Sequence, residues 1–112
     1  MTSKLEQIQL NYAKSIKISD LATQLGLSRS HLYRIFKAET GYSIEEYLVS
    51  VRINAARSLL SETNFSCSSI ASLVGYAHYT TFFKIFKNNT GYTPQQYRAK
   101  MKKALEENEN NN

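Results

Sequence analysis

The segment LYRIFKAETGY at residues 32–42 returns 50 positions later as FFKIFKNNTGY at residues 82–92. Both copies space their apolar residues three and four positions apart and then reach Thr-Gly-Tyr, a pattern typical of an amphipathic helix that ends at glycine. A shorter match precedes each copy, because DLATQLG at residues 20–26 corresponds to SIASLVG at residues 69–75. This self-similarity indicates one structural unit that occurs twice in the chain.

Each copy predicts a short helix, a turn at its first glycine and a longer helix, which together form a helix-turn-helix motif. The glycines predicted to end these helices are Gly26, Gly41, Gly75 and Gly91. Ser28 is the predicted N-cap of the longer helix in the first copy, and the second copy has His78, a poorer cap, in that place. One extra residue between Gly75 and Phe82 indicates a turn there, since turns tolerate insertions.

The fold class predicted for the whole chain is all-α, with two helix-turn-helix subdomains joined by a long central helix. Seven helices are expected, at residues 3–13, 19–25, 29–40, 43–61, 68–74, 78–90 and 93–105. The only proline, Pro94, falls in the first turn of the last helix, where proline is best tolerated. The predicted divisions are a first subdomain at 1–42, a linker helix at 43–62, a second subdomain at 63–105 and a disordered tail at 106–112.

The central helix carries two apolar stripes about a third of a turn apart. One stripe holds Ile44, Tyr47, Leu48, Val51, Ala55 and Leu59, and the other holds Val49, Ile53, Ala56 and Leu60. A helix with two apolar stripes favours a strut that packs one helix-turn-helix unit on each side. The helix would be roughly 28 Å long, close to the ~34 Å between successive major grooves on one face of DNA.

Charge and composition narrow the class of protein. The 112 residues carry a net charge of +5, and residues 63–105 contain six basic residues and no acid, which favours a polyanionic partner. The longest apolar run is three residues, so no membrane segment or signal peptide is expected. The single cysteine, Cys67, permits no intrachain disulfide. A cytoplasmic protein is therefore predicted.

The longer helix of each copy has one side that the apolar residues leave free. On these sides and at the helix starts lie the candidate DNA-binding residues Ser28, Arg29, Ser30, Tyr33, Arg34, Lys37, His78, Tyr79, Thr80, Phe83, Lys84 and Lys87. Cations, hydroxyls and aromatic rings without an acid suit phosphates and base edges. Arg34 is favoured as a reader of guanine, whereas the three lysines favour phosphate or solvent.

Several residues have a structural alternative. Tyr33 and Tyr79 could pack at the rim of the core, and Arg52 is interpreted as a structural hydrogen-bonding residue of the central helix. Lys100, Lys102 and Lys103 fit either a solvated helix end or contacts with the DNA backbone.

The chain is not expected to be an enzyme. His31 and His78 lack a metal-ligand cluster around them, and no glycine-rich phosphate loop or catalytic triad is found, so neither a metal nor a cofactor is predicted. The alternative to DNA binding is an α-helical protein-interaction module whose basic faces dock on an acidic partner. Random-site selection with duplex DNA would separate the two.

These residues resemble the DNA-binding domain of the AraC/XylS family of bacterial transcription regulators over about residues 5–102. The matching segments are ISDLA at 18–22, LYRIFK at 32–37, RINAARSLL at 52–60, VGY at 74–76, FFKIFK at 82–87, GYTP at 91–94 and Tyr97-Arg98. The resemblance implies a sequence-specific double-stranded DNA-binding domain, with two recognition helices in adjacent major grooves of an asymmetric site.

By position, the resemblance assigns base reading to eight of the candidates: Arg29, Ser30, Tyr33, Arg34, Tyr79, Thr80, Phe83 and Lys84. Phe83 departs from the more usual polar residue, which leaves open contact with a thymine methyl or weak reading by the second unit. The resemblance also implies a monomeric domain, RNA polymerase as a partner and transcription activation. A separate sensor domain that dimerises the full-length protein is expected to be missing from this chain; the alternative is a small stand-alone regulator.

Overall fold

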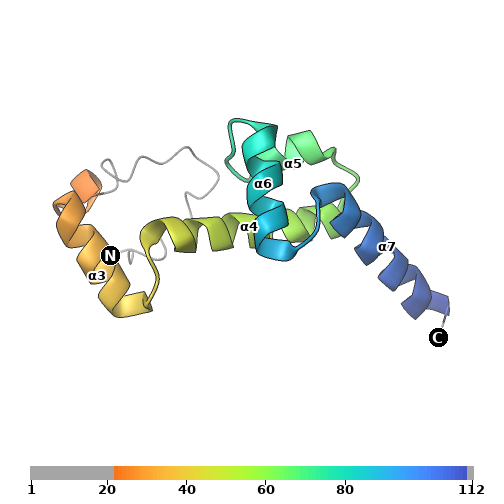
Figure 1. The fold of residues 1–112 in the computed structure, drawn as a ribbon, viewed down its shortest axis with the longest axis horizontal. Helices are drawn as coiled ribbons and strands as arrows, with labels where there is room; N and C mark the ends of the chain where they lie inside the picture. Colours follow the sequence, from red (N-terminus) through yellow and green to blue (C-terminus); the bar gives the residue numbers. More distant parts are fainter. Residues whose placement is uncertain (1–21, 111–112) are drawn as a thin grey trace.

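The computed structural model describes residues 22–110, and this part of the chain contains helices and no strands. Helical residues 22–24 come first and are followed by five longer helices (Figure 1). These are α3 (Arg29–Thr40), α4 (Ile44–Glu62), α5 (Cys67–Leu73), α6 (Tyr79–Thr90) and α7 (Pro94–Asn110). The all-α prediction is confirmed, while the helix predicted at 3–13 and the beginning of the one at 19–25 lie outside the described residues.

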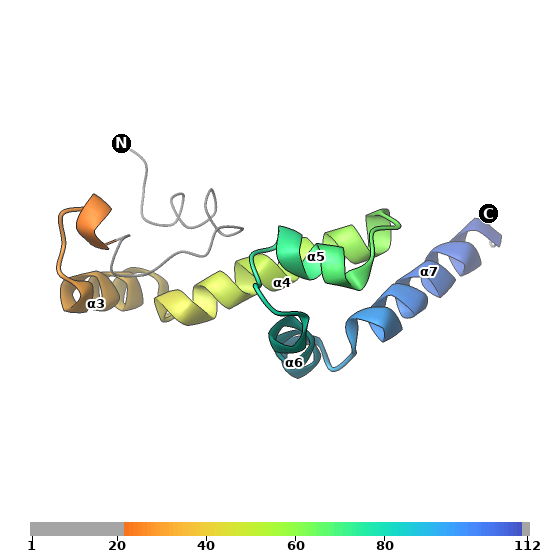
Figure 2. The ribbon, with the colours of Figure 1, turned by 90° about the horizontal axis from the view of Figure 1, so that it is seen from above.

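The long helix α4 organises an elongated molecule of 53 × 30 × 24 Å. Figures 1 and 2 show α3 at the start of α4, with α5, α6 and α7 gathered around its other half. The helices α3 and α6 run in broadly the same direction across that of α4 (Figure 1). The central helix therefore separates two similarly oriented helices along its length. Within the described residues, no helix is long and apolar enough to span a membrane.

The turn inside each helix-turn-helix unit is formed by the same backbone hydrogen bonds. The matching pairs are Gly26 N to Thr23 O and Gly75 N to Ser72 O, both 3.1 Å, and Leu27 N to Ala22 O and Tyr76 N to Ala71 O, both 2.9 Å. Residues 27–28 then lead to α3, and residues 76–78 lead to α6. The extra residue of the second copy thus lies in the turn, as predicted.

Both longer helices also end in the same way. Gly41 and Gly91 take left-handed conformations, with φ of 80° and 81°, in which a side chain would be strained. In the turn before them, the Thr40 and Thr90 hydroxyls each donate at 2.8 Å to the carbonyl oxygen four residues earlier. The predicted glycine ends of these helices are confirmed.

The helix starts differ between the two units. Ser28 Oγ accepts a 3.1 Å hydrogen bond from the His31 backbone N–H, as an N-cap does. His78 occupies the N-cap position of α6 without a side-chain capping bond. The sequence predicted a poorer N-cap for α6 than for α3, and the structure agrees.

The two cores divide α4 along its length rather than around it. The first core contains Ala22, Leu32, Phe36 and Ile44, with Tyr47 and Leu48 against it. The second core contains Ile53, Ala56 and Leu60 of α4, with Val49, Ala55 and Leu59 against it. The expectation of one unit on each stripe is wrong, because Ala55 and Leu59 of one stripe pack against the same core as the residues of the other stripe. Because α4 is roughly 28 Å long, the position of a residue along the helix axis decides which unit it packs against.

The last helix begins as predicted and ends later than predicted. Thr93 and Gln96 form a reciprocal capping box, in which Thr93 Oγ1 accepts from Gln96 N at 3.2 Å and Gln96 Oε1 accepts from Thr93 N at 3.0 Å. Pro94 is the first helical residue. The helix passes the predicted end at Leu105 and continues to Asn110, so residues 106–110 of the predicted disordered tail are helical. No glycine or proline follows Leu105, and Glu106 and Glu107 are good helix formers.

Candidate nucleic-acid interface

One side of α3 carries most of the first unit's candidate residues. This exposed face of α3 is defined here as Arg29, Ser30, Tyr33, Arg34 and Lys37. Four of these side chains are exposed and Tyr33 is half-buried. On the opposite side of the helix, Leu32 and Phe36 are 0% and 1% exposed. The sequence thus separates the buried side of α3 from a side that is free to meet a ligand.

The exposed face of α6, defined as Tyr79, Thr80, Phe83, Lys84 and Lys87, occupies the equivalent positions. Thr80 and both lysines are exposed, whereas Tyr79 and Phe83 are half-buried. Phe82 and Phe86, on the inner side, are both 0% exposed. The candidate residues of the two units are therefore brought to corresponding sides of two equivalent helices, with Ser28 and His78 exposed at the helix starts.

Three side chains of the first unit form a connected set. The Tyr33 hydroxyl donates a hydrogen bond to Glu45 Oε1, which joins α3 to the first turn of α4. The Arg29 guanidinium lies over the Tyr33 ring, with Cζ 5.6 Å from the ring centroid. Hydrogen bonding and charge interaction with Tyr33, helped by the Glu45 carboxylate, raise the pKa of Arg29 above its usual value. Arg29 is therefore a cation at every physiological pH.

The equivalent region of the second unit is aromatic. The Tyr79 ring lies 6.1 Å from the centroids of both Phe82 and Phe83 and packs against the second core. Burial raises the pKa of the Tyr79 hydroxyl. Tyr79 thus has the packing role that the sequence left open, while part of the residue remains exposed.

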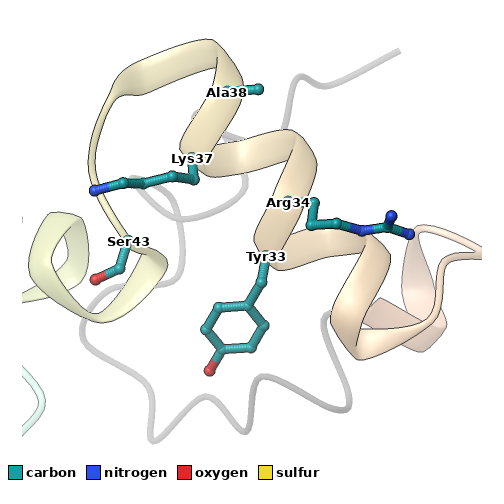
Figure 3. Close-up of a pocket in the computed structure, with 5 residues that line it drawn as sticks. All are labelled: Tyr33, Arg34, Lys37, Ala38 and Ser43. Atoms are coloured by element: carbon teal, nitrogen blue, oxygen red, sulfur yellow. The ribbon is translucent and has the colours of Figure 1, made fainter.

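A shallow hollow of about 500 Å³ lies beside α3. Its lining residues are Tyr33, Arg34, Lys37, Ala38 and Ser43 (Figure 3). In this view Arg34 and Lys37 extend in different directions from α3, and Tyr33 points away from the helix between them. Two cations around an open hollow provide donors for phosphate oxygens or base edges without enclosing a small molecule.

The basic residues of α7 fall into different environments. Lys100 Nζ donates to the Tyr92 hydroxyl at 2.6 Å and lies 4.4 Å from the ring centroid. Lys102 and Lys103 are exposed. Lys100 therefore already has a hydrogen-bond partner within the protein, and the sequence alone could not separate it from the exposed lysines Lys102 and Lys103.

The Arg52 guanidinium lies 5.0 Å from the centroid of the Tyr76 ring, which agrees with its predicted structural role. Cys67 is a buried free cysteine at the start of α5. Across residues 22–110, His, Cys, Asp and Glu side chains do not gather in groups of three or more that could hold a metal ion.

Sequence reasoning missed two residues that shape this region. No role was predicted for Glu45, yet its Oε1 accepts a hydrogen bond from the Tyr33 hydroxyl. Arg98 donates to the carbonyl oxygens of Leu60 at 3.1 Å and Phe65 at 2.5 Å, so it fastens α7 to the end of α4 and the loop beyond it. Comparing equivalent positions of the two copies could have marked both, because unit two has Gln95 in place of Glu45 and unit one has Leu48 in place of Arg98.

The fold and its two exposed helix faces define a tandem helix-turn-helix domain of the nucleic-acid-binding class. The family model described as "Helix-turn-helix domain" matches residues 21–100. The chain belongs to this family and is an AraC-type DNA-binding domain, as the sequence predicted. It is the DNA-binding domain of a transcription factor.

Two curated relatives and one solved structure illustrate the likeness. The chain is 42% identical over 91 residues to the raffinose operon transcriptional regulatory protein RafR of Pediococcus pentosaceus, covering 81% of this chain and 33% of that protein. It is 37% identical over 94 residues to the Msm operon regulatory protein of Streptococcus mutans, covering 84% and 34%. The C-terminal domain of the response regulator yesN from Fusobacterium nucleatum superposes with a TM-score of 0.83 and 32% identity, covering 85% and 93%. The chain thus spans about a third of the length of these two curated relatives.

Proposed function

We propose that this domain binds double-stranded DNA as a monomer, with α3 and α6 in adjacent major grooves of an asymmetric site. The observation that carries the proposal is the pair of equivalent helices, each with a free cationic side, held apart along α4. A separation set by a helix of roughly 28 Å is compatible with the ~34 Å repeat of the major groove.

In this proposal the two units read DNA differently. Arg29 and Arg34 of α3 have the donors for bidentate contact with guanine, and Ser30 and Tyr33 have hydroxyls for further contacts. The rings of Tyr79 and Phe83 favour contact with thymine methyl groups, and Thr80 can bond to any base. Lys37, Lys84 and Lys87 act on phosphates, together with the backbone N–H groups at the helix starts next to Ser28 and His78.

The test is random-site selection with duplex DNA at physiological salt. We expect an enriched motif with two blocks centred about 10 base pairs apart, of which the block under α3 has the stronger base preference. Arg34→Ala should weaken the block under α3, and Thr80→Ala with Phe83→Ala should weaken the block under α6. Lys84→Ala with Lys87→Ala should weaken binding without changing either block. If no motif is enriched, or if binding disappears at physiological salt, the proposal is wrong and docking on an acidic protein becomes the better hypothesis.

For the whole protein, we propose a regulator that activates transcription in the bacterial cytoplasm together with RNA polymerase. The names of the two curated relatives, both regulators of operons, support a role in transcription regulation, and a further relative, from Staphylococcus xylosus, is named a lactose operon transcription activator. A reporter gene placed downstream of the selected motif tests it. Expression should rise when the protein is present, and a fall in expression would indicate a repressor.

A further inference from the structure

Glu45 reaches the exposed face of α3 from a different helix. It is the second residue of α4, and its side chain is exposed to solvent. Its Oε1 accepts the hydrogen bond of the Tyr33 hydroxyl, and the Tyr33 ring in turn lies under the Arg29 guanidinium. Glu45 is thus linked through Tyr33 to Arg29, a cation on the proposed DNA-binding surface.

We propose that Glu45 is a positioning residue for base recognition: it holds Tyr33, and through Tyr33 it orients Arg29 before DNA is bound. This inference rests on the proposed function, in which Arg29 contacts a base. Glu45 itself touches no base in this scheme.

The physical reason is the flexibility of an exposed arginine. A free arginine side chain loses rotamer entropy when it is ordered, and binding is tighter when that ordering has already occurred. A guanidinium held in one orientation also discriminates better between base pairs, since only one arrangement of acceptors matches its donors.

The second unit provides an internal comparison. Positions 29, 33 and 45 correspond to Tyr79, Phe83 and Gln95. The first two of these still touch, with ring centroids 6.1 Å apart. Phe83 has no hydroxyl, and the carboxylate is replaced by an amide at the third position. The hydroxyl and its acidic acceptor are therefore present together in one unit and absent together in the other.

The experiment compares base preference among variants by the same random-site selection. Arg29→Ala first identifies the base pair that Arg29 reads. Glu45→Ala and Tyr33→Phe should each lower the preference at that base pair by roughly three- to tenfold, and the double variant should lower it no further. Glu45→Gln keeps an acceptor oxygen and should retain most of the preference.

Glu46→Ala is the matched control, because Glu46 is the adjacent exposed residue with the same charge. Its backbone N–H bonds to Ser43 Oγ at 3.1 Å, an interaction that alanine preserves. Loss of either acid should tighten binding to all sequences slightly, since each repels phosphates. Only the loss of Glu45 should change base preference.

Three outcomes would overturn the inference. Glu45→Ala could behave like Glu46→Ala, in which case Glu45 contributes only charge. It could alter a base pair that both Arg29→Ala and Tyr33→Phe leave unchanged, in which case Glu45 contacts DNA directly. Arg29→Ala could leave every preference intact, in which case Arg29 reads no base. If the unmodified domain enriches a motif in any of these cases, the proposed function still stands, and it fails only if no motif is enriched.

Discussion

The two helix-turn-helix units share a backbone and differ in the chemistry that they expose. The helices α3 and α6 have 12 residues each and end at glycines with almost identical φ angles. Both bury the same two positions, with Leu32 and Phe36 in one and Phe82 and Phe86 in the other. Their exposed faces differ, since the first has two arginines and a tyrosine bonded to an acid, whereas the second has two packed aromatic rings.

This contrast separates the requirements of folding from those of recognition. The buried side needs apolar volume at fixed spacing, so both units have kept it. The exposed side makes few contacts within the protein, so its residues are free to differ with the ligand. Five predictions test this division, beginning with the buried side.

Phe36→Ala and Phe86→Ala should each destabilise the domain by about 3–5 kcal/mol, because each leaves a cavity in a core that excludes solvent. The free energy of unfolding from urea titration, followed by circular dichroism, measures the loss. Phe83→Ala is the control on the exposed face and should cost much less. A small loss for only one of the two buried phenylalanines would contradict the equivalence of the units.

Arg98→Ala should cost about 2–3 kcal/mol, since it leaves the carbonyl oxygens at the end of α4 without their charged donor. Lys102→Ala, one turn later on α7 and exposed, is the control and should be nearly neutral. The same urea titration applies. Equal effects of the two substitutions would show that the Arg98 contacts with Leu60, Thr63 and Phe65 do not stabilise the domain.

Arg34→Ala should weaken binding to the selected motif by ~1–3 kcal/mol and relax the preference at one base pair. Titration of the domain with motif variants, one base pair changed at a time, measures both effects. A loss of the same size on every sequence would mean that Arg34 contacts only the DNA backbone.

Substitutions at the two N-cap positions should change the stability of the domain in opposite directions. Ser28→Ala removes the hydrogen bond to the His31 N–H and should destabilise the domain by about 1 kcal/mol. His78→Ser provides a capping oxygen that α6 lacks and should stabilise the domain by roughly 0.5–1 kcal/mol. Thermal unfolding measures both. If His78→Ser weakens DNA binding while it stabilises the fold, His78 is retained for contact with DNA.

Lys84→Ala should have the smallest effect. The slope of log K for DNA binding against log salt concentration should become flatter by about one unit. Affinities at several salt concentrations measure the slope. The reduction should be similar on matched and unmatched DNA because a phosphate contact carries no sequence information. An unchanged slope would place Lys84 away from the phosphates.

The local structure could be predicted from the sequence to a large extent. The repeat at residues 32–42 and 82–92 predicted the two long helices and their buried sides, and the glycines predicted where these helices end. The inserted residue was correctly assigned to the turn before α6. Each of these features depends on hydrogen bonds and side-chain spacing within a few residues, so it can be read from neighbouring letters.

Contacts between helices could not be predicted in this way. Tyr33 meets Glu45 across the corner between α3 and α4, and Arg98 bonds to carbonyl oxygens more than 30 residues earlier in the chain. The prediction of one unit on each stripe of α4 failed because periodicity gives the angle of a residue around the helix and not its position along the axis.

Within residues 22–110, the sequence by itself thus determined which helices form and which sides of α3 and α6 are buried. The tertiary structure decided which exposed residues are held and which are free: Lys100 is bonded to Tyr92, Arg29 lies over Tyr33, and Arg34 and Lys84 remain exposed. The physical reason is that the orientation of a surface side chain depends on partners that the crossing of distant helices brings within reach.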